Sequence, residues 1–401
     1  SPLNTSLGSL NGPSITVSNP LSVNGSITNT GNIASPYNVL TSNGLGGIQW
    51  QKWQSITGNV GPSTITLGSN TTGAYNTAVG QQALYRLSTT SYNTAIGYQS
   101  AYSNTTGGSN VALGQQALRS NTTASNNTAV GYQALYANTN GPNTAVGTAA
   151  LYTNTTGYNN NAFGVSALRL NTTGTNNTAL GDSALYNNTT ASDNTAVGYQ
   201  AAYNNTSGAI ITAVGYQCLY SNTTGIDNHA FGDRALRANT TGADNAAFGY
   251  ATLFSNTTGS YNTAFGALAL LNNTTASNNT AFGYQAGYSN TTGANNIALG
   301  NGALYSNTTA SQNTAVGYQA GYLNTTGQGI TAIGAQVLYN NTTGGQSIRV
   351  KTASGTGITI ANGTKVPLYV DGTNVTYAFN PMWDPAGTAD NAAIAFAVAL
   401  G

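Results

Sequence analysis

The sequence is dominated by a unit of seventeen residues that recurs between positions 76 and 344. Its fixed point is a glycine, which returns every 17 residues from Gly80 onward, with one interval of 16 before Gly147, as far as Gly334. The unit reads N-T-A-(V/I/L/F)-G-Y-Q-A-L-Y-S-N-T-T-G-x-N. Self-similarity at a fixed short period is typical of a solenoid, in which each repeat forms one coil that packs on its neighbours.

The residues that precede each glycine predict a short β-strand. Alanine always stands two positions before the glycine, and a large apolar residue always stands one position before it. Neighbouring side chains of a strand point to opposite faces, so one face carries alanine and the other carries threonine and the large apolar residue. Apolar groups on both faces indicate a strand that is buried on both sides.

The second half of the unit ends in a turn, N-T-T-G, in which Asn and Thr side chains bond to nearby backbone and Gly tolerates a positive φ. The segment Y-Q-A-L-Y that precedes this turn fits either a second strand or a single helical turn.

A coil of this length encloses few side chains, so the second apolar face of each strand requires a partner. An unbroken column of small residues lets two backbones approach closely. We therefore predict an oligomer in which the alanine column packs between chains. The residues assigned to this contact are Ala78, Ala95, Ala112, Ala230 and Ala247.

The core N-T-A-V-G-Y-Q-A resembles the head repeats of trimeric autotransporter adhesins, whose strands run S-V-A-I-G-x-x-S. The resemblance covers about two-thirds of the chain and implies a parallel β-roll in a homotrimer, although the repeats of that family are usually shorter. The sequence that follows Gln346, S-I-R-V-K-T-A-S-G-T-G-I-T-I-A-N-G-T-K, is similar to a module at the ends of tail-fibre and other structural proteins of marine bacteriophages. Together these likenesses imply a virion fibre.

The composition excludes several function classes. Charged residues make up 4% of the chain, there is no glutamate, and the net charge is +1. Such a surface neither attracts nucleic acid nor steers the chain to an anionic membrane. No apolar run reaches the roughly 18 residues of a membrane span, so no membrane insertion is expected. The single cysteine, Cys218, excludes an internal disulfide, and its place in a small-residue column predicts a buried side chain.

Three regions follow from these patterns: an N-terminal β-rich attachment or capping region (1–68), a repeat shaft (69–344) and a C-terminal β-meander tip (345–401). Sixteen coils that each rise by one strand spacing would span roughly 75 Å.

Both terminal regions show strand and hairpin patterns. In the first, the runs 14–18 and 21–23 read as strands, and Trp50 and Trp53 read either as an anchor for the shaft or as a docking surface. In the last, strands are predicted at 348–350, 358–360, 366–370 and 375–379, with Asp371-Gly372 as a hairpin turn between the final two.

Aspartates are candidates for catalytic carboxylates, because glycoside hydrolases use a pair of carboxylates. Asp193, Asp227 and Asp244 share the column five before the glycine, and Asp182 and Asp233 share the column one after it. They replace polar turn residues, which favours a solvated ladder over a Ca²⁺ site or a catalytic pair. The lone His229 supports neither a triad nor a metal site, so no catalytic, cofactor or metal-binding residue is predicted.

The column five after the glycine is mostly tyrosine and is interrupted by arginine. Stacked rings on adjacent coils would stabilise the rod, and the alternative is a glycan-binding strip that includes Tyr288, Tyr305 and Tyr322. The Asn-Thr-Thr sequences of the turn could accept N-glycans, but their periodic place favours side chains that bond across coils.

We therefore expect an all-β protein, a parallel β-solenoid in a homotrimeric fibre, that is non-catalytic and binds no cofactor. As a tail or capsid fibre on the virion surface it would provide reach and host attachment. Its partners would be copies of itself, a baseplate or capsid protein, and a host surface glycan or protein. The alternatives are the shaft of an adhesin on the bacterial cell surface and a polysaccharide-degrading tailspike.

Overall fold

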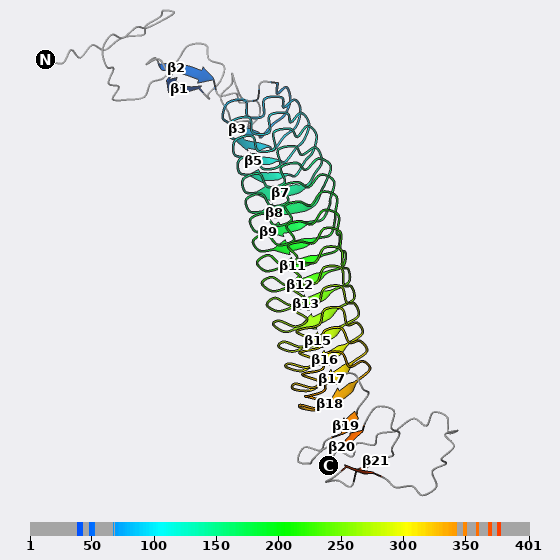
Figure 1. Cartoon of the computed structure of the whole chain (residues 1–401). Coiled ribbons are helices and arrows are strands. Elements are labelled where there is room, and N and C mark those ends of the chain that lie inside the picture. The colour runs from blue at the N-terminus through cyan, green and yellow to red at the C-terminus, as the bar shows by residue number, and fades with distance from the viewer. Residues whose placement is uncertain are drawn as a thin grey trace, which may run out of the picture.

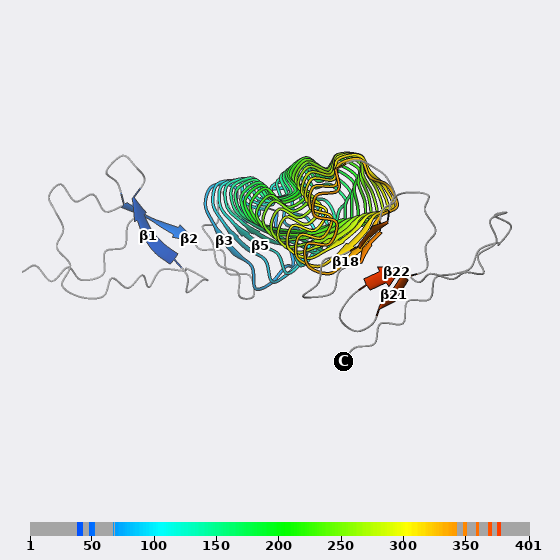
Figure 2. The same ribbon diagram turned by 60° about the horizontal axis from the view of Figure 1, so that its bottom comes forward.

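The computed structural model describes Leu67 and residues 69–342 in full, together with the backbone of six strands outside that range. The described part is all-β and contains no helix. Residues 69–342 form an elongated, gently curved stack of coils (Figure 1), and successive coils superpose when the rod is viewed closer to its end (Figure 2). No helix among the described residues is long and apolar enough to cross a membrane.

One parallel sheet of 16 strands runs the length of the rod in sequence order, from β3 to β18. Each strand pairs in register with the strand one coil away, so that Ala213 lies beside Ala230 and Ala230 beside Ala247. The chain is therefore a parallel β-solenoid, as the repeat predicts. The strands are β3 (Thr77–Val79), β4 (Thr94–Ile96), β5 (Val111–Leu113), β6 (Thr128–Val130), β7 (Asn143–Val146), β8 (Asn160–Phe163), β9 (Thr178–Leu180), β10 (Thr195–Val197), β11 (Thr212–Val214), β12 (His229–Phe231), β13 (Ala246–Phe248), β14 (Thr263–Phe265), β15 (Thr280–Phe282), β16 (Ile297–Leu299), β17 (Thr314–Val316) and β18 (Thr331–Ile333).

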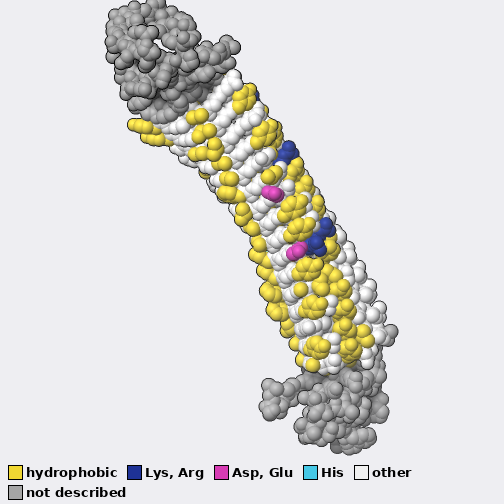
Figure 3. All heavy atoms as spheres, turned by 90° about the vertical axis from the view of Figure 1, so that its left-hand side faces the viewer, with side chains coloured by type: hydrophobic (Ala, Val, Ile, Leu, Met, Phe, Trp, Pro, Cys, Tyr) yellow, Lys and Arg dark blue, Asp and Glu magenta, His cyan; other side chains and the backbone are white. Residues whose placement is uncertain are grey.

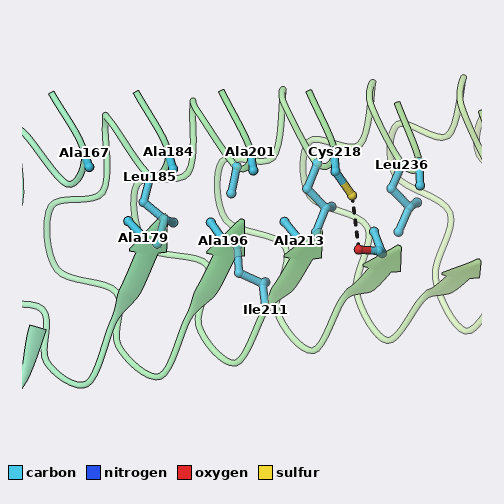
Figure 4. Close-up of a cluster of buried hydrophobic side chains, with 14 of the residues drawn as sticks. Ala167, Ala179, Ala184, Leu185, Ala196, Ala201, Ile211, Ala213, Cys218 and Leu236 are labelled. Carbon is cyan, nitrogen blue, oxygen red and sulfur yellow. Dashed lines mark hydrogen bonds between the residues drawn. The ribbon is translucent and has the colours of Figure 1, made fainter. Parts of the chain in front are cut away.

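The hydrophobic core lies inside each coil and is built from alanine and leucine. The alanine of each strand points inward and faces the alanine and leucine that follow the glycine by three and four residues (Figure 4). A Cβ built on Gly321, in the leucine column, would lie 3.9 Å from the Cβ of Ala315 on the strand. Two layers this close leave room only for a methyl group on one side, which explains why the strand column is alanine.

The expected role of the alanine column is therefore wrong. Its members are at most 3% exposed within a single chain, so a second chain cannot touch them. The residues assigned to the contact between chains are 0–1% exposed: Ala78, Ala95, Ala112, Ala230 and Ala247. The expectation that both faces of the strand are buried is also wrong for one chain, because the large apolar side chains point outward.

The segment Y-Q-A-L-Y forms neither a strand nor a helical turn. It is a run of turns in which the second and fourth residues after the glycine are usually left-handed, as in Gln217 (φ 50°) and Leu219 (φ 52°). The N–H of Gln217 donates to the carbonyl of Tyr199 on the preceding coil, and the N–H of Leu219 donates to that of Ala235 on the following coil. These bonds to both neighbours explain why leucine is held at a φ that it rarely adopts.

The repeated glycine marks the corner between strand and turn. Gly266 has a φ of +123°, and an added Cβ would lie 2.7 Å from the carbonyl carbon and oxygen of Gly283 on the next coil. Only glycine fits at this corner, because backbone of the neighbouring coil occupies the space of a side chain.

Two columns of buried asparagine run along the rod. Asn239, in the N-T-T turn, donates from Nδ2 to Oδ1 of Asn222 on the preceding coil (2.8 Å) and to the carbonyl of Gly242 in its own turn (2.9 Å). In the second column, four residues before the glycine, Oδ1 of Asn228 accepts the backbone N–H of Asn245 (3.1 Å). These bonds satisfy polar groups in a dry interior, which is what a buried amide requires.

The coil with the 16-residue interval interrupts the first asparagine column. Nδ2 of Asn138 donates to Oδ1 of Asn127 at 3.3 Å. Oδ1 of Asn121 is consequently the one buried side-chain polar atom of the described residues without a hydrogen-bond partner.

The strands beyond the rod pair as antiparallel hairpins. They are β1 (Asn38–Ser42) with β2 (Ile48–Lys52), β19 (Ile348–Val350) with β20 (Ile358–Ile360), and β21 (Leu368–Val370) with β22 (Val375–Tyr377). The last two pairs confirm the strands predicted at those positions. The predicted strands at 14–18 and 21–23 lie outside the described residues, and no side chain of Trp50 or Trp53 is described.

Candidate functional site

The column five residues after each glycine runs along the rod and is here called the tyrosine ladder. Within it, Tyr288, Tyr305, Tyr322 and Tyr339 stack with ring centroids 4.8–5.0 Å apart and interplanar angles of 2–9°. The members are Tyr85, Tyr102, Arg119, Tyr136, Tyr152, Arg169, Tyr186, Tyr203, Tyr220, Arg237, Phe254, Leu271, Tyr288, Tyr305, Tyr322 and Tyr339.

Arginine continues the ladder where tyrosine is absent. The guanidinium of Arg169 lies 5.5 Å from the ring centroid of Tyr152 and 5.6 Å from that of Tyr186, and its Nη1 donates to the hydroxyl of Tyr186 (2.7 Å). Arg119 is placed in the same way between Tyr102 and Tyr136. Cation–π contact therefore replaces ring stacking without a break, as the structural interpretation of this column predicts.

The ladder geometry limits what a glycan could contact. Because each ring of Tyr288, Tyr305 and Tyr322 lies parallel to the next, their faces cover one another and the half-buried rings present mainly edges and hydroxyls to solvent. A sugar that stacks on an aromatic ring needs an open face. Burial, together with the neighbouring Tyr305 and Tyr339 hydroxyls, also raises the pKa of Tyr322.

A second exposed column lies on the outer face of the sheet and is here called the outer ridge. Its members are the large apolar residues one position before each glycine, and most are more than a third exposed, up to 66% at Ile333. They are Val79, Ile96, Leu113, Val130, Val146, Phe163, Leu180, Val197, Val214, Phe231, Phe248, Phe265, Phe282, Leu299, Val316 and Ile333. The four successive phenyl rings stack at 4.8–5.0 Å.

Hydrophobic side chains gather in columns along one side of the rod, with few charged groups between them (Figure 3). Soluble monomers rarely expose a contiguous apolar strip of this length, and such strips commonly mark contact with another molecule.

The aspartates occupy exposed or half-exposed places. Asp193, Asp227 and Asp244 take the left-handed turn position that precedes the buried asparagine, with φ of 51–61°, where Asn and Asp are favoured. Asp182 accepts the backbone N–H of Val165 (2.9 Å), and Asp233 pairs with Arg234 (3.6 Å). Each aspartate therefore has a conformational or hydrogen-bonding reason for its place.

His229 lies on the outer face of β12, and its Nδ1 is 3.2 Å from the hydroxyl of Thr212. Residues 69–342 contain no group of three or more His, Cys, Asp or Glu side chains that could hold a metal ion.

The asparagine of each buried Asn-Thr-Thr turn is inaccessible. Asn104, for example, is fully buried, donates to the carbonyl of Gly107 (2.8 Å) and accepts the N–H of the same residue (3.1 Å). The side-chain amide that would carry an N-glycan is thus part of the core, which agrees with the structural interpretation of these sequences.

A hollow opens on the surface where the repeat departs from its consensus. It has a volume of about 330 Å³ and lies between the tyrosine ladder and the column two residues after the glycine, here called the amide column. Its walls include Ala251 and Leu268 from the amide column and Phe254 and Leu271 from the ladder. The sequence pattern predicts no site at this place.

No protein-family model, curated protein or solved structure matches this chain. The likeness to adhesin heads and phage fibres accordingly stays an expectation. Function has to be inferred from the rod, its outer ridge and its hollow.

Proposed function

We propose that this chain is a structural subunit of a virion fibre, in a tail or on a capsid, that provides reach and attaches the particle to its host without turning over a substrate. The main support is the unbroken sheet of 16 strands in one rod. Every coil is hydrogen-bonded to its neighbours both in the strand and in the turns. Such a rod can hold its two ends at a fixed separation, which is what a fibre must do.

The outer ridge supports self-association of the fibre subunits. Burying the exposed parts of its side chains would remove on the order of 1,000 Å² per chain from water, more than the roughly 800 Å² per partner of a standard interface. The ridge repeats every 4.8–5.0 Å where its phenyl rings stack, and a second copy of the chain presents apolar side chains at the same spacing. The resemblance to adhesin heads favours three copies.

In this proposal one end of the rod binds a baseplate or capsid protein, and exposed surface contacts a host glycan or protein. Five aspartates and five arginines are spread along the described rod, so electrostatic steering contributes little. An uncharged surface of Asn, Thr, Ser and Gln would keep its binding properties over a wide range of salt and pH.

Labelling residue 1 and imaging whole virus particles by electron microscopy tests the proposal. Label at fixed positions on fibres of the particle is expected. Label on bacterial cell surfaces without virus would instead identify the shaft of an adhesin, and shortening of host surface polysaccharide by the purified chain would identify a degrading tailspike. The absence of label from both particles and cells would contradict a fibre role.

A further inference from the structure

The amide column consists mostly of glutamine, and its side chains bond to each other along the rod. Gln133 donates from Nε2 to Oε1 of Gln116 (2.8 Å), and Gln217 donates to Gln200 in the same way (2.9 Å). Nε of Arg237, in the tyrosine ladder, donates to Oε1 of Gln217 (3.1 Å). The amide column and the ladder are therefore neighbours, and glutamine side chains help to cover the surface between them.

Ala149, Ser166, Ser183 and Gly302 also replace glutamine in this column, but only within one group of three successive coils does the neighbouring ladder lose tyrosine and arginine as well. The amide column carries Arg234, Ala251 and Leu268 in place of glutamine. In two of these coils the ladder carries Phe254 and Leu271, which lack the tyrosine hydroxyl. The hollow of about 330 Å³ lies at this break. Every other coil keeps tyrosine or arginine in the ladder, so a local change in both columns indicates a requirement other than folding.

Arg234 is the cationic group of the hollow and differs from the arginines of the ladder. Arg119, Arg169 and Arg237 donate hydrogen bonds to tyrosine or glutamine side chains. Among the described residues, the Arg234 guanidinium makes only an ion pair, with Nε 3.6 Å from Oδ1 of Asp233, and lies 5.7 Å from the ring centroid of Tyr216. A guanidinium has five N–H donors in a planar fork, so donors remain for a ligand.

The other walls are apolar with a polar edge. Ala251 is 4% exposed and, with Phe254, Leu268 and Leu271, provides a hydrocarbon surface. Tyr250, Ser255 and Asn272, whose side chains carry hydroxyl and amide groups, also belong to the lining. The hollow thus combines an apolar surface, neutral hydrogen-bonding groups and a single cation, and its volume is at the low end for a ligand site.

We propose that this hollow binds an acidic sugar unit, a pyranose that carries a carboxylate, within a host surface polysaccharide. The C–H face of the pyranose fits the apolar walls, its hydroxyls fit Ser255 and Asn272, and its carboxylate fits the fork of Arg234. The single cation beside Asp233 suits one negative charge and disfavours a doubly charged phosphate. This inference rests on the proposed attachment function and names the class of glycan that the fibre contacts.

The test uses two pairs of probes that differ in the carboxylate: oligogalacturonate against its methyl ester, and sialyllactose against lactose. Titration calorimetry and saturation-transfer NMR on the full chain measure binding. At least one acidic probe is expected to bind at least tenfold more tightly than its neutral counterpart.

Two substitutions that restore the consensus glutamine provide the variants. Arg234→Gln removes the cation, and Ala251→Gln fills the hollow. Both should fold, because Gln217 occupies the same column with a φ of 50°, close to the 57° of Arg234 and the 50° of Ala251. Each variant should weaken binding of the acidic probe at least tenfold. Gln319→Ala, in the amide column of another coil, is the matched control and should leave binding unchanged.

Equal binding of the acidic and neutral probes overturns the proposal, as does full affinity in Ala251→Gln. Particle imaging separates this outcome from failure of the fibre role. A chain found in virion fibres that does not discriminate carboxylates contradicts only the sugar site, whereas a chain absent from virions contradicts the fibre itself.

Discussion

The Sγ atom of Cys218 lies 3.2 Å from the carbonyl oxygen of Ala230, on the strand of the next coil (Figure 4). The thiol occupies a column that is otherwise mostly alanine, and burial raises its pKa to about 12. Reaction with a disulfide reagent requires the thiolate. At about pH 8 the native chain should therefore react far more slowly than the same chain in concentrated guanidinium chloride, as followed by absorbance. Rapid stoichiometric labelling of the native chain would contradict the buried position of Cys218.

The same burial predicts a loss of stability in alkaline solution. The pKa of Cys218 is raised from 9.0 to about 12, and those of Tyr203 and Tyr322 are raised mainly by burial. The folded chain thus holds these protons more tightly than the unfolded chain, so their contribution is complete below about pH 9 and is lost as the pH rises further.

Thermal melts at about pH 8 and about pH 10.5 measure this loss. Cys218→Ala, which restores the usual residue of the column, should lessen it by on the order of 1–2 kcal/mol of unfolding free energy. An equal decrease in Tm for the wild type and Cys218→Ala would show that the thiol does not contribute.

The buried asparagine ladder predicts a marked difference between two substitutions at one site. Asn239→Asp and Asn239→Leu both remove the donor that reaches Asn222 and Gly242, but only Asn239→Asp adds a buried negative charge beside those two oxygens. Asn239→Leu introduces the side chain that Leu87 provides, fully buried, in the first coil.

Urea unfolding should show Asn239→Asp to be the less stable of the two variants at neutral pH, by about 1–3 kcal/mol. The difference in unfolding free energy between the two variants should become smaller in acid, because a protonated carboxyl at position 239 is neutral and can donate a hydrogen bond. A difference that does not change with pH would argue against the ladder as the cause.

The repeat was sufficient to predict the solenoid, the strands and the N-T-T-G turn, because each column has one environment repeated many times, but not the run of turns formed by Y-Q-A-L-Y. It did not predict which face of the strand lies inside. The alternation of side chains along the strand places Ala247 and Phe248 on opposite faces but does not say which face is the core. The coil is so narrow that, of these two side chains, only the alanine methyl group fits inside it. Left-handed Leu219 was not predictable either, because hydrogen bonds to both neighbouring coils impose its conformation.

The sequence does contain an indication of the hollow, since Ala251 and Leu268 replace the glutamine that is most common in the amide column. This indication could not be interpreted from the sequence alone, because it gains meaning only when the amide column is known to lie beside Phe254 and Leu271. That neighbourhood depends on the cross-section of the coil, which the period does not specify.

Stacking in the tyrosine ladder predicts a stability change that depends on the ring and not on its hydroxyl. Replacing Tyr288, Tyr305 and Tyr322 together by serine removes three stacked pairs. At about 0.5–1.5 kcal/mol per pair, the Tm should fall clearly. The corresponding phenylalanine variant keeps the stacking, as Phe254 does beside Arg237, and should melt close to the wild type. A serine variant that melts like the wild type but loses glycan binding would favour a binding strip over a structural ladder.

The outer ridge predicts that association of chains depends on its phenyl rings. Replacing Phe248, Phe265 and Phe282 by serine removes apolar area from the outer face while the inward alanines stay in place. Sedimentation equilibrium should show the wild-type chain as an oligomer, and its mass gives the number of copies. The association constant of the variant should be at least tenfold lower. The matched control is Ile210→Asn, Ile226→Ser and Tyr261→Asn, which removes three apolar side chains that are 44–63% exposed from the turn. The control should associate like the wild type. A monomeric wild-type chain, or equal weakening by both sets of substitutions, would show that the ridge does not join copies of this chain.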